Sequence, residues 1–594
     1  MQEYTMPGEV NVPATETLTT SIFEAYEQHP TRPAFATRVG GAFQTISTKA
    51  FVDDVVATAS GLMGLGIKAG DRVCIMSPTR YEWTVVDYAI WAAGAVTVPI
   101  YETSSAEQVE WIVGNSEAVA IIVADAELKT IFDDVADRLP ACAHVFVLDD
   151  GGLDTLRAAG DSDHATVRAR SETRTGSDLA TLVYTSGTTG RPKGVELSHT
   201  NFVWDATQVV NIAGEFFRAG ESTLLFLPLA HIFARLIQVG SVRSGVLLAY
   251  STGIPALLEE LQMLKPTFLL AVPRVFEKVF NGAQQRSHAD GKGKIFDKAA
   301  ATAIAYSEAQ TSGATIGLKL KLEHALFDKL VYSKLRTAMG GRIRFAVSGG
   351  AALGTRLGHF YNGIGITILE GYGLTETSAG ATLNAPSAFR IGSVGRPLPG
   401  ASVKIAEDGE VLIKSGGVLK GYFKNDAATK EAITEDGWFC SGDLGSIDSE
   451  GYLSITGRKK EIIVTAGGKN VAPAPLEDRI RAHNLISQAM VIGDDRKFVS
   501  AVLTLDPDAF PVWAAANGKA GKTVADLVDD AELHAELQKA VDDANKSVSK
   551  AESIRAFKIL PVDFEIGDEL SQKQSVKRHV VNKKYSDVIE SIYS

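Results

Sequence analysis

Short apolar runs alternate with amphipathic segments along the first part of the chain. The runs at 71–76 and 118–123 are typical of buried strands, whereas 82–92 has the spacing of an amphipathic helix. This alternation predicts βαβ units, whose mainly parallel sheets are covered by helices on both faces. Residues 20–70 are predicted to be helical with polar breaks. Further strands are predicted at 95–100, 144–148, 222–227, 268–272 and 343–347.

The character of the sequence changes in three later stretches. Residues 281–338 are rich in Ala and Lys and poor in strand formers, which predicts an inserted helical region. Between 401 and 455, short strands and Gly-rich turns predict a small β-rich subdomain. The last stretch, 457–594, alternates helices and strands and opens with the charged segment 457–461, which is a candidate hinge.

These patterns predict an α/β fold with two domains. The large N-terminal domain, 1–456, would contain stacked, mainly parallel sheets with helices, plus the small β-rich subdomain. The C-terminal domain, 457–594, would be a small mobile α+β domain that turns about the charged segment.

Composition narrows the class of protein. With 594 residues, 45% of them hydrophobic and 22% charged, the chain is an ordinary globular protein with room for several domains. A net charge of -12 argues against a protein that coats nucleic acid. Three widely spaced cysteines fit a reducing compartment. We see no signal peptide and no apolar run of the roughly 18–20 residues that span a bilayer, and therefore expect a cytoplasmic protein.

The segment 184–194 carries the strongest chemical signal. It cannot continue as strand or helix, because Gly187, Gly190 and Gly194 free the backbone and Pro192 breaks a helix. Its hydroxyl groups and cations are Thr185, Ser186, Thr188, Thr189, Arg191 and Lys193. Such a loop offers N–H groups, hydroxyls and positive charge to a polyphosphate. It lacks the Gly-Lys-Ser/Thr of a Walker A loop, and the alternative is a flexible surface hairpin.

A second candidate is the segment 371–376, Gly-Tyr-Gly-Leu-Thr-Glu, which follows an apolar run at 364–369. Tyr372 offers an aromatic face and Glu376 a carboxylate. A carboxylate beside phosphates needs a hard cation between them, and Mg²⁺ takes one or two carboxylates together with phosphate oxygens. The alternative is a strand-end turn with a solvated glutamate.

Three further segments are weaker candidates. Asp443, in Ser-Gly-Asp, is by itself most typical of a turn. His231 lies in Phe-Leu-Pro-Leu-Ala-His-Ile-Phe, where a histidine among apolar residues is more often a satisfied core residue than a catalyst. Gly467 and Gly468 lie in the loop 465–473, which also fits a tight hairpin between two strands.

In this order, the motifs resemble those of the adenylate-forming enzymes. Ser-Gly-Thr-Thr-Gly-x-Pro-Lys-Gly resembles the phosphate loop of that family, and Tyr-Gly-x-Thr-Glu resembles its adenine and magnesium motif. The pattern from Leu62 to Tyr585 resembles the long-chain fatty acid–CoA ligases (AMP-forming), most of all bacterial, actinobacterial members. The subfamily features are 226–231, 272–279, 460–470 and the helical insertion.

The resemblance implies a role for each matched residue. Thr185 and Glu376 would hold Mg²⁺, and Lys193 would act on the phosphates. The implied ATP-binding residues are Thr185, Ser186, Gly187, Thr188, Thr189, Lys193, Gly349, Gly350, Gly371, Tyr372, Gly373, Thr375, Asp443 and Arg458. The other implied roles are substrate placement for His231, the hinge for Lys460, and lining of the CoA channel for Gly467 and Gly468.

The C-terminal segment departs from the family pattern. The family usually has Glu-Leu-Thr-Pro-Thr-x-Lys-x-Lys-Arg, whose first Lys contacts the α-phosphate and the carboxylate, but the segment 569–578 places Ser575 there. Losing that ammonium would remove electrostatic stabilisation from the adenylation transition state. We expect either that Lys573 takes the role by a local register shift or that adenylation is slow. The alternative for this basic tail is a solvated helix end.

The function implied by the resemblance is activation of a long-chain fatty acid. The acid would attack ATP to give acyl-AMP, and CoA would then take the acyl group, so the expected partners are fatty acid, ATP and CoA, with Mg²⁺ as cofactor and no nucleic acid. Peripheral membrane contact stays open, since the sequence shows no clear basic amphipathic helix. The alternatives are an acyl-AMP ligase that loads a carrier protein, a luciferase-like oxygenase, and an acyl-nucleotide binder with weak catalysis.

Overall fold

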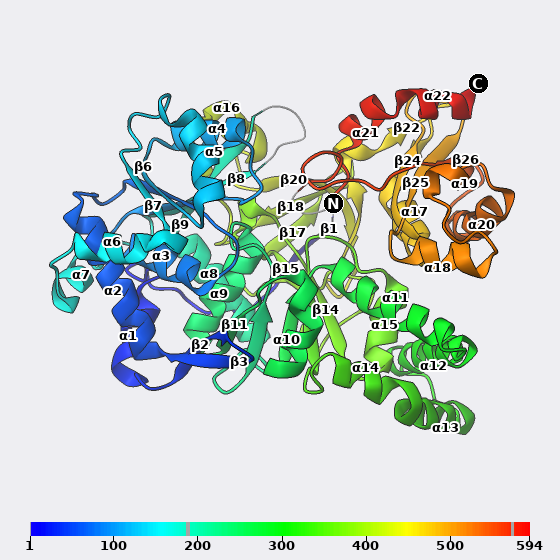
Figure 1. Ribbon diagram of the computed structural model, residues 1–594, viewed down its shortest axis with the longest axis horizontal. Coiled ribbons are helices and arrows are strands. Elements are labelled where there is room, and N and C mark those ends of the chain that lie inside the picture. The colour runs from blue at the N-terminus through cyan, green and yellow to red at the C-terminus, as the bar shows by residue number, and fades with distance from the viewer. Residues whose placement is uncertain (1, 186–190, 572–574) are drawn as a thin grey trace.

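In the computed structural model, which describes residues 2–185, 191–571 and 575–594, the chain forms two lobes (Figure 1). The large lobe comprises the elements from β1 to β21, and the small lobe those from β22 to α22. The main apolar core of the large lobe draws on residues from Leu18 to Leu453. Two further apolar clusters lie wholly within the small lobe, between Ile463 and Ile589. The two lobes therefore have separate cores.

A seven-stranded sheet carries the loop 184–194. Its strands β5, β4, β6 and β7 are parallel, as predicted, and β8 continues the parallel set. Strand β9 pairs antiparallel with both β8 and β19. Buried apolar side chains cover both faces of the parallel part, since one cluster lies on each side. The strands are β4 (Arg72–Met76), β5 (Val96–Ile100), β6 (Ala118–Val123), β7 (His144–Val147), β8 (Leu179–Thr185), β9 (Lys193–Ser198) and β19 (Gly421–Tyr422).

A five-stranded sheet carries the segment 371–376. Strands β12, β13 and β14 are parallel, and Ser348 of β13 pairs with Glu370 of β14, so both strands end at the same edge. The segments that follow, Gly349–Gly350 and Gly371–Glu376, therefore emerge side by side. The strands are β12 (Phe268–Ala271), β13 (Phe345–Ser348), β14 (Thr367–Tyr372), β15 (Thr382–Leu383) and β16 (Arg396–Pro397).

A third sheet of the large lobe corrects the helical expectation for residues 20–70. Two helices do lie there, but an antiparallel hairpin separates them, and its turn uses Gly40 at φ +60°. Only Phe35 and Ala36 of the hairpin are buried, and its other residues are partly buried or exposed, so its apolar signal is weak. The strands of this sheet are β2 (Pro33–Val39), β3 (Ala42–Ser47), β10 (Ser222–Leu225) and β11 (Leu247–Tyr250).

Helices fill the space between and around these sheets. Helix α3 is buried from Trp83 to Ala92, as expected for a helix enclosed by other layers. The helices outside the insertion and the small lobe are α1 (Thr20–Gln28), α2 (Thr48–Gly64), α3 (Tyr81–Ala92), α4 (Ala106–Ser116), α5 (Ala126–Ala136), α6 (Gly152–Ala158), α7 (His164–Ser171), α8 (His199–Ile212), α9 (Ile232–Ser244), α10 (Leu257–Leu264), α15 (Thr355–Gly363) and α16 (Asp426–Ala432).

The predicted helical insertion is confirmed. Figure 1 shows it at the lower right edge of the large lobe. Phe280 of the insertion contacts Phe296 and Phe360 edge-on, which fixes its first two helices against α15. Its elements are α11 (Pro273–Ala289), α12 (Gly293–Thr311), α13 (Leu318–Phe327), the π-helical turn η3 (Asp328–Tyr332) and α14 (Ser333–Ala338).

The β-rich part of the large lobe is also confirmed, and it recruits the start of the chain. Residues Gln2–Thr5 form β1, which pairs antiparallel with β17 and was not predicted. The other strands are β17 (Ser402–Ile405), β18 (Glu410–Lys414), β20 (Phe439–Ile447) and β21 (Leu453–Arg458), in the order β1-β17-β18-β20-β21.

The small lobe is an α+β unit. A three-stranded sheet and one short hairpin are flanked by helices, and Leu533, Leu537 and Val541 line the buried face of α20. Its elements are β22 (Ile463–Val464), β23 (Asn470–Val471), α17 (Pro473–Arg481), β24 (Ile486–Ile492), β25 (Val499–Leu505), α18 (Ala509–Ala516), α19 (Val524–Leu527), α20 (Ala531–Asn545), β26 (Ile554–Ile559), α21 (Arg578–Lys584) and α22 (Ser586–Tyr593).

Arginine side chains of the large lobe reach the small lobe. The Arg274 guanidinium donates to Ser487 Oγ at 3.2 Å and lies 3.8 Å from the Asp506 carboxylate. Arg356 donates to the carbonyl of Ala482 at 3.4 Å.

No described helix combines the length and apolar character that crossing a bilayer requires.

Candidate nucleotide and acyl activation site

Two residues face each other where the loop 184–194 leaves its sheet. Thr185, at the end of β8, pairs with Lys193, at the start of β9. The guanidinium of Arg191 lies 4.7 Å from the centre of the Trp111 ring, and the indole of Trp111 donates to the carbonyl of Pro192 at 2.8 Å. The loop base thus presents a hydroxyl and an ammonium, while Arg191 is held to one side.

The central part of the predicted phosphate loop lies outside the described residues. It contains four of the residues predicted to bind ATP, Ser186, Gly187, Thr188 and Thr189, together with Gly190. Their roles stay predictions.

Tyr422 contacts both Glu376 and Lys193, and so links Glu376 to the base of that loop. The Tyr422 hydroxyl donates to Glu376 Oε1 at 2.9 Å, and the Lys193 ammonium lies 5.1 Å from the centre of the Tyr422 ring. Tyr422 also pairs with Val195 in the β19–β9 ladder, which holds it beside the loop. The structure therefore brings Lys193 and Glu376 to the same side of the large lobe.

The donor set here suits a hard cation. A glutamate carboxylate and a threonine hydroxyl are both oxygen ligands of the kind that Mg²⁺ accepts. Tyr422 engages one oxygen of Glu376, and no hydrogen bond to Oε2 is found within the described chain. Oε2 of Glu376 and the Thr185 hydroxyl are the atoms that would take part.

A second group of contacts joins Tyr372, Asp443 and Arg458. The Tyr372 hydroxyl donates to Asp443 Oδ2 at 2.7 Å, and Arg458 forms an ion pair with Asp443, with Nε 3.2 Å from Oδ1. Asp443 and Arg458 face each other across the β20–β21 ladder. Burial raises the pKa of Asp443, and the neighbouring Arg458 charge opposes that rise. Three residues predicted for ATP binding thus meet from distant parts of the sequence.

Gly349 and Gly350, which are predicted to bind ATP, lie at the same edge of the five-stranded sheet as the segment 371–376. A side chain at Gly349 would lie 3.5 Å from the Phe233 ring and 3.8 Å from the carbonyl of Gly371. Gly350 has φ +84°, which favours glycine, and its nearest neighbour is Val272. The segment Gly349–Gly350 therefore borders the β14 turn, as the parallel strands require.

The turn that contains Gly373 and Thr375 is tightly built. A Cβ at Gly373 would lie 1.9 Å from the carbonyl oxygen of Ala379, so only glycine fits. Thr375 is buried at the start of a short 3₁₀ turn with Glu376. This turn fixes the backbone from which the Glu376 carboxylate projects.

His231 begins α9 and is only partly buried, so it is not the core residue that the ordinary interpretation expected. Its Nδ1 accepts the backbone N–H of Phe233 at 3.1 Å, which caps the helix. An accepting Nδ1 is unprotonated, so the neutral ring carries its proton on Nε2. Because Phe233 borders Gly349, the helix start lies next to the site, and a role for His231 in substrate placement stays a prediction.

The candidate hinge and channel residues belong to the connection and the small lobe. Lys460 lies in the turn η5 (Lys459–Glu461) between β21 and β22. Gly467 and Gly468 form a tight hairpin between β22 and β23, in which the N–H of Gly468 donates to Thr465 O at 2.7 Å. The hairpin interpretation is confirmed, and the open space around both glycines is compatible with the channel interpretation.

Two cationic side chains of the C-terminal tail have partners within the small lobe. The Lys577 ammonium donates to the carbonyl of Gly567 at 2.7 Å, and Arg578 pairs with Glu477 at 2.5 Å. Ser575 is exposed and bonds only its neighbour Ser571 within the described residues. Lys573 lies outside the described residues, so its proposed substitution for the family lysine stays a prediction.

Sequence reasoning missed two sets of residues near the site. Tyr422 stands in a two-residue strand, where no local pattern marks it. Arg235 and Asp87 form a fully buried ion pair at 2.6 Å, and Arg235 also donates to Thr181 on β8 at 2.7 Å. The available signal for that pair was a charge in the middle of each of two largely apolar helices.

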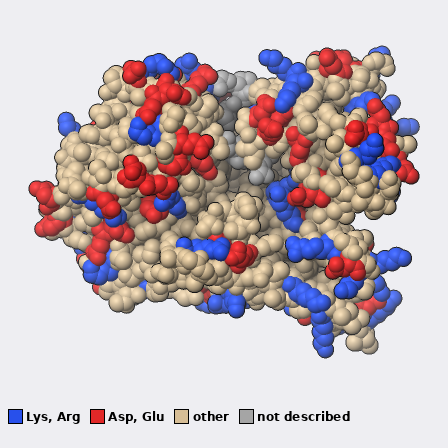
Figure 2. All heavy atoms as spheres, in the orientation of Figure 1, with Lys and Arg blue, Asp and Glu red and all other residues tan. Residues whose placement is uncertain are grey.

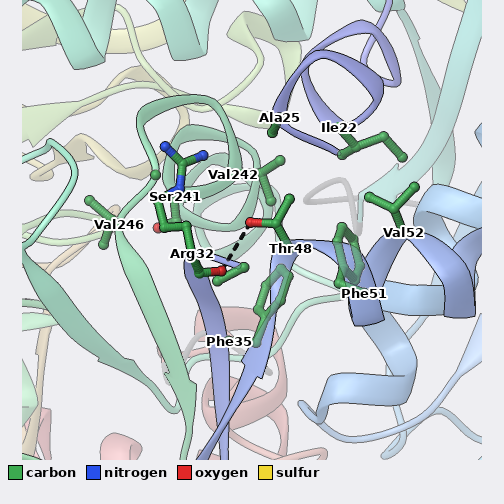
Figure 3. A pocket seen from close by; sticks show the side chains of 12 residues that line it. Ile22, Ala25, Arg32, Phe35, Thr48, Phe51, Val52, Ser241, Val242 and Val246 are labelled. Atoms are coloured by element: carbon green, nitrogen blue, oxygen red, sulfur yellow. Dashed lines mark hydrogen bonds between the residues drawn. The ribbon is translucent and has the colours of Figure 1, made fainter. Parts of the chain in front are cut away.

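A pocket beside the other end of α9 is separate from these groups. Figure 3 shows it among α1, α2, α9 and β2, lined by apolar side chains such as Ile22, Phe35 and Phe51. Ser241 lies ten residues after His231, which corresponds to about 15 Å along a helix. None of the residues predicted for ATP binding lines this pocket.

Comparisons with known proteins match most of the chain to one enzyme family. The family described as AMP-binding enzyme matches residues 22–423, and the AMP-binding enzyme C-terminal domain matches 460–594. The long-chain-fatty-acid–CoA ligase FadD15 of Mycobacterium bovis is 49% identical over the full length of both chains. The long-chain-fatty-acid–CoA ligase ACSBG2 of Xenopus laevis is 32% identical over 94% of this chain and 81% of its own.

Solved structures agree on the fold. The adenylation domain of a carboxylic acid reductase from Segniliparus rugosus, in complex with AMP and a co-purified carboxylic acid, superposes with a TM-score of 0.75 at 21% identity, covering 98% of this chain and 95% of that one. The anthranilate CoA ligase AuaEII, in complex with anthranoyl-AMP, gives 0.74 at 18% identity over 96% and 98%. The chain belongs to the AMP-binding enzyme family, in the branch whose full-length relatives include actinobacterial long-chain-fatty-acid–CoA ligases.

Proposed function

We propose that this protein is a long-chain fatty acid–CoA ligase that works through an acyl-AMP intermediate. The observation that carries the proposal is the convergence of Lys193, Tyr422 and Glu376 on one side of the large lobe. The full-length identity to long-chain-fatty-acid–CoA ligases supports the substrate class.

In the first half-reaction, a fatty acid carboxylate oxygen attacks the α-phosphorus of ATP. The bond to the bridging oxygen breaks, and pyrophosphate leaves with its electron pair. Lys193 offers positive charge to the phosphates, and bound Mg²⁺, held by Glu376 and Thr185, would neutralise charge on the leaving group. Asp443 and Arg458 would bind the ribose, because an ionised carboxylate accepts from two hydroxyls.

In the second half-reaction, the CoA thiolate attacks the carbonyl carbon of the mixed anhydride. The bond between that carbon and the phosphate oxygen breaks, and AMP leaves. We propose that the small lobe turns about Lys460 between the two steps and brings Gly467 and Gly468 to the channel. Lys460→Pro should keep acyl-AMP formation and impair thioester formation, whereas an equal loss in both would contradict the hinge.

The test is a coupled assay of AMP release with Mg²⁺, CoA and fatty acids of graded length. Formation of acyl-CoA, identified by mass spectrometry, is the expected result. AMP release without acyl-CoA, together with acylation of a carrier protein, would favour an acyl-AMP ligase. No ATP consumption with any chain length would refute the proposal.

Ser575 is the one observation that favours a weak catalyst, since the family lysine is missing at that position. We propose that Lys573 supplies the ammonium. Pyrophosphate release should fall for Lys573→Ala but not for the matched variant Gln572→Ala. Unchanged adenylation in both variants would exclude Lys573.

We further propose a cytoplasmic location, with fatty acid, ATP and CoA as the small-molecule partners. All three cysteines are free thiols, which suits a reducing compartment. The net charge of -12 gives no support for nucleic acid as a partner.

A further inference from the structure

A row of exposed leucines runs along α13 and into the turn that follows it. Leu318, Leu322, Leu326 and Leu330 are 72, 62, 54 and 47% exposed. Residues four positions apart lie on the same side of a helix, so the four side chains form one continuous stripe. Globular proteins normally turn such a stripe toward their core. We call these four residues the leucine stripe.

The opposite face of the same helix is firmly attached to the large lobe. The His324 ring stacks on Tyr306 with ring centres 3.9 Å apart, and its Nε2 donates to the carbonyl of Gly363 at 2.7 Å. Phe327 is buried, and the Tyr332 hydroxyl donates to the carbonyl of Ala299 at 2.6 Å. These contacts fix the rotation of α13, so the leucine stripe points outward because of packing.

Lysines alternate with the leucines on the exposed surface. Lys319, Lys321 and Lys329 are exposed and take part in none of the ion pairs found in the described part of the chain. The two nearby acids are already neutralised, since Glu323 lies 3.5 Å from Lys298 and Asp328 lies 2.7 Å from Arg336. The positive charges on the stripe are therefore uncompensated.

The charge of this region is opposite to that of the whole molecule. Residues 292–336 contain eight Lys and Arg against four Asp and Glu, whereas the chain as a whole has a net charge of -12. Figure 2 shows Lys and Arg side chains gathered at the lower right, over the helices that Figure 1 labels α12 and α13. This end of the insertion would attract an anionic surface while most of the molecule would not.

We propose that the outer face of α13 docks on an anionic lipid surface. The leucine stripe would enter the boundary between headgroups and acyl chains, and the three lysines would lie among anionic headgroups. A second protein fits less well, because lysines are depleted from the centres of protein interfaces and here they alternate with the exposed leucines. The surface lies on the insertion that begins beside Gly350, so docking would hold the nucleotide site near a membrane.

The test is sedimentation of the full chain with vesicles, without ATP or fatty acid, so that the result does not depend on catalysis. Wild-type protein should bind vesicles that contain phosphatidylglycerol and bind neutral phosphatidylcholine vesicles at least tenfold more weakly. Leu322→Gln/Leu326→Gln and, separately, Lys319→Gln/Lys321→Gln/Lys329→Gln should each reduce binding to the anionic vesicles about tenfold or more. Added salt should weaken the wild-type binding.

Matched controls come from exposed positions of the small lobe. Val512→Gln/Val562→Gln and Lys522→Gln/Lys546→Gln/Lys550→Gln remove the same kinds of groups elsewhere and should leave vesicle binding unchanged. Circular dichroism melting checks that every variant folds. Wild-type protein that ignores anionic vesicles, or stripe variants that bind as well as wild type, would overturn the proposal. A dimer in solution that the leucine variant dissociates would assign the stripe to a second copy instead.

Discussion

Replacing Tyr422 by phenylalanine tests whether Tyr422 positions the Glu376 carboxylate, which is proposed to bind Mg²⁺. The change removes the hydroxyl that donates to Glu376 Oε1 at 2.9 Å and keeps the ring that faces the Lys193 ammonium at 5.1 Å. Burial raises the pKa of Tyr422, and the Glu376 carboxylate raises it further, so the hydroxyl is a proton donor at every physiological pH. Without it, Glu376 loses the contact that orients its carboxylate.

The size of the effect follows from the kind of bond. A hydrogen bond to a charged group contributes about 1.5–3 kcal/mol. Because Tyr422 is only partly buried, we take the lower end, which corresponds to about a tenfold loss in kcat/KM. The Mg²⁺ concentration at half-maximal rate should rise as well, since Glu376 is the proposed ligand.

The assay is fatty-acid-dependent exchange between ATP and pyrophosphate, measured across a range of Mg²⁺ concentrations. Tyr81→Phe is the matched control, because the Tyr81 hydroxyl donates to the Asp54 carboxylate at 2.8 Å between α2 and α3. It should change stability without changing the Mg²⁺ dependence. Tyr422→Phe with wild-type kcat/KM and wild-type Mg²⁺ dependence would refute the positioning role.

Three further changes probe the same lobe. Burial lowers the pKa of His199 from 6.5 to about 3, so between these pH values only the unfolded chain binds the proton. The free energy of unfolding should therefore be highest above pH 6.5 and about 3 kcal/mol lower at pH 4.5. In urea unfolding, His199→Asn should flatten this dependence on pH. Arg235→Met leaves Asp87 as an unpaired buried charge and should cost about 3–5 kcal/mol of unfolding free energy, part of which the added change Asp87→Asn should restore. Asp443→Asn removes the charge proposed to bind ribose and should raise KM for ATP about tenfold with little change in kcat, whereas an unchanged KM would remove Asp443 from the site.

The buried strands could be predicted from the sequence because they are enclosed on both faces. The run 118–123 is β6, residue for residue, and the run 95–100 contains the whole of β5. Such strands are apolar throughout, so their signal survives without knowledge of the fold. The glycine-rich motifs were equally visible, because Gly373 has no room for a side chain and Gly350 has a positive φ that favours glycine.

Elements that depend on distant partners could not be predicted in this way. Strand β1 exists because β17 offers an edge some four hundred residues away, and its own residues are largely exposed. Tyr422 acquires its position from the β19–β9 pairing and its partner Glu376 from another sheet. The lysines and leucines of α13 were visible as letters, but only packing by His324 and Phe327 decides that the leucines face outward.

The contacts that join the two lobes have a consequence for their free energy of separation. When the lobes separate, water can replace the hydrogen bonds and ion pairs of Arg274 and Arg356 almost one for one, whereas the apolar core of each lobe stays buried within that lobe. Separation of the lobes would therefore expose little apolar surface. The two lobes should therefore move as rigid bodies across a polar interface. Proteolytic cleavage of the segment that connects them should leave both lobes folded.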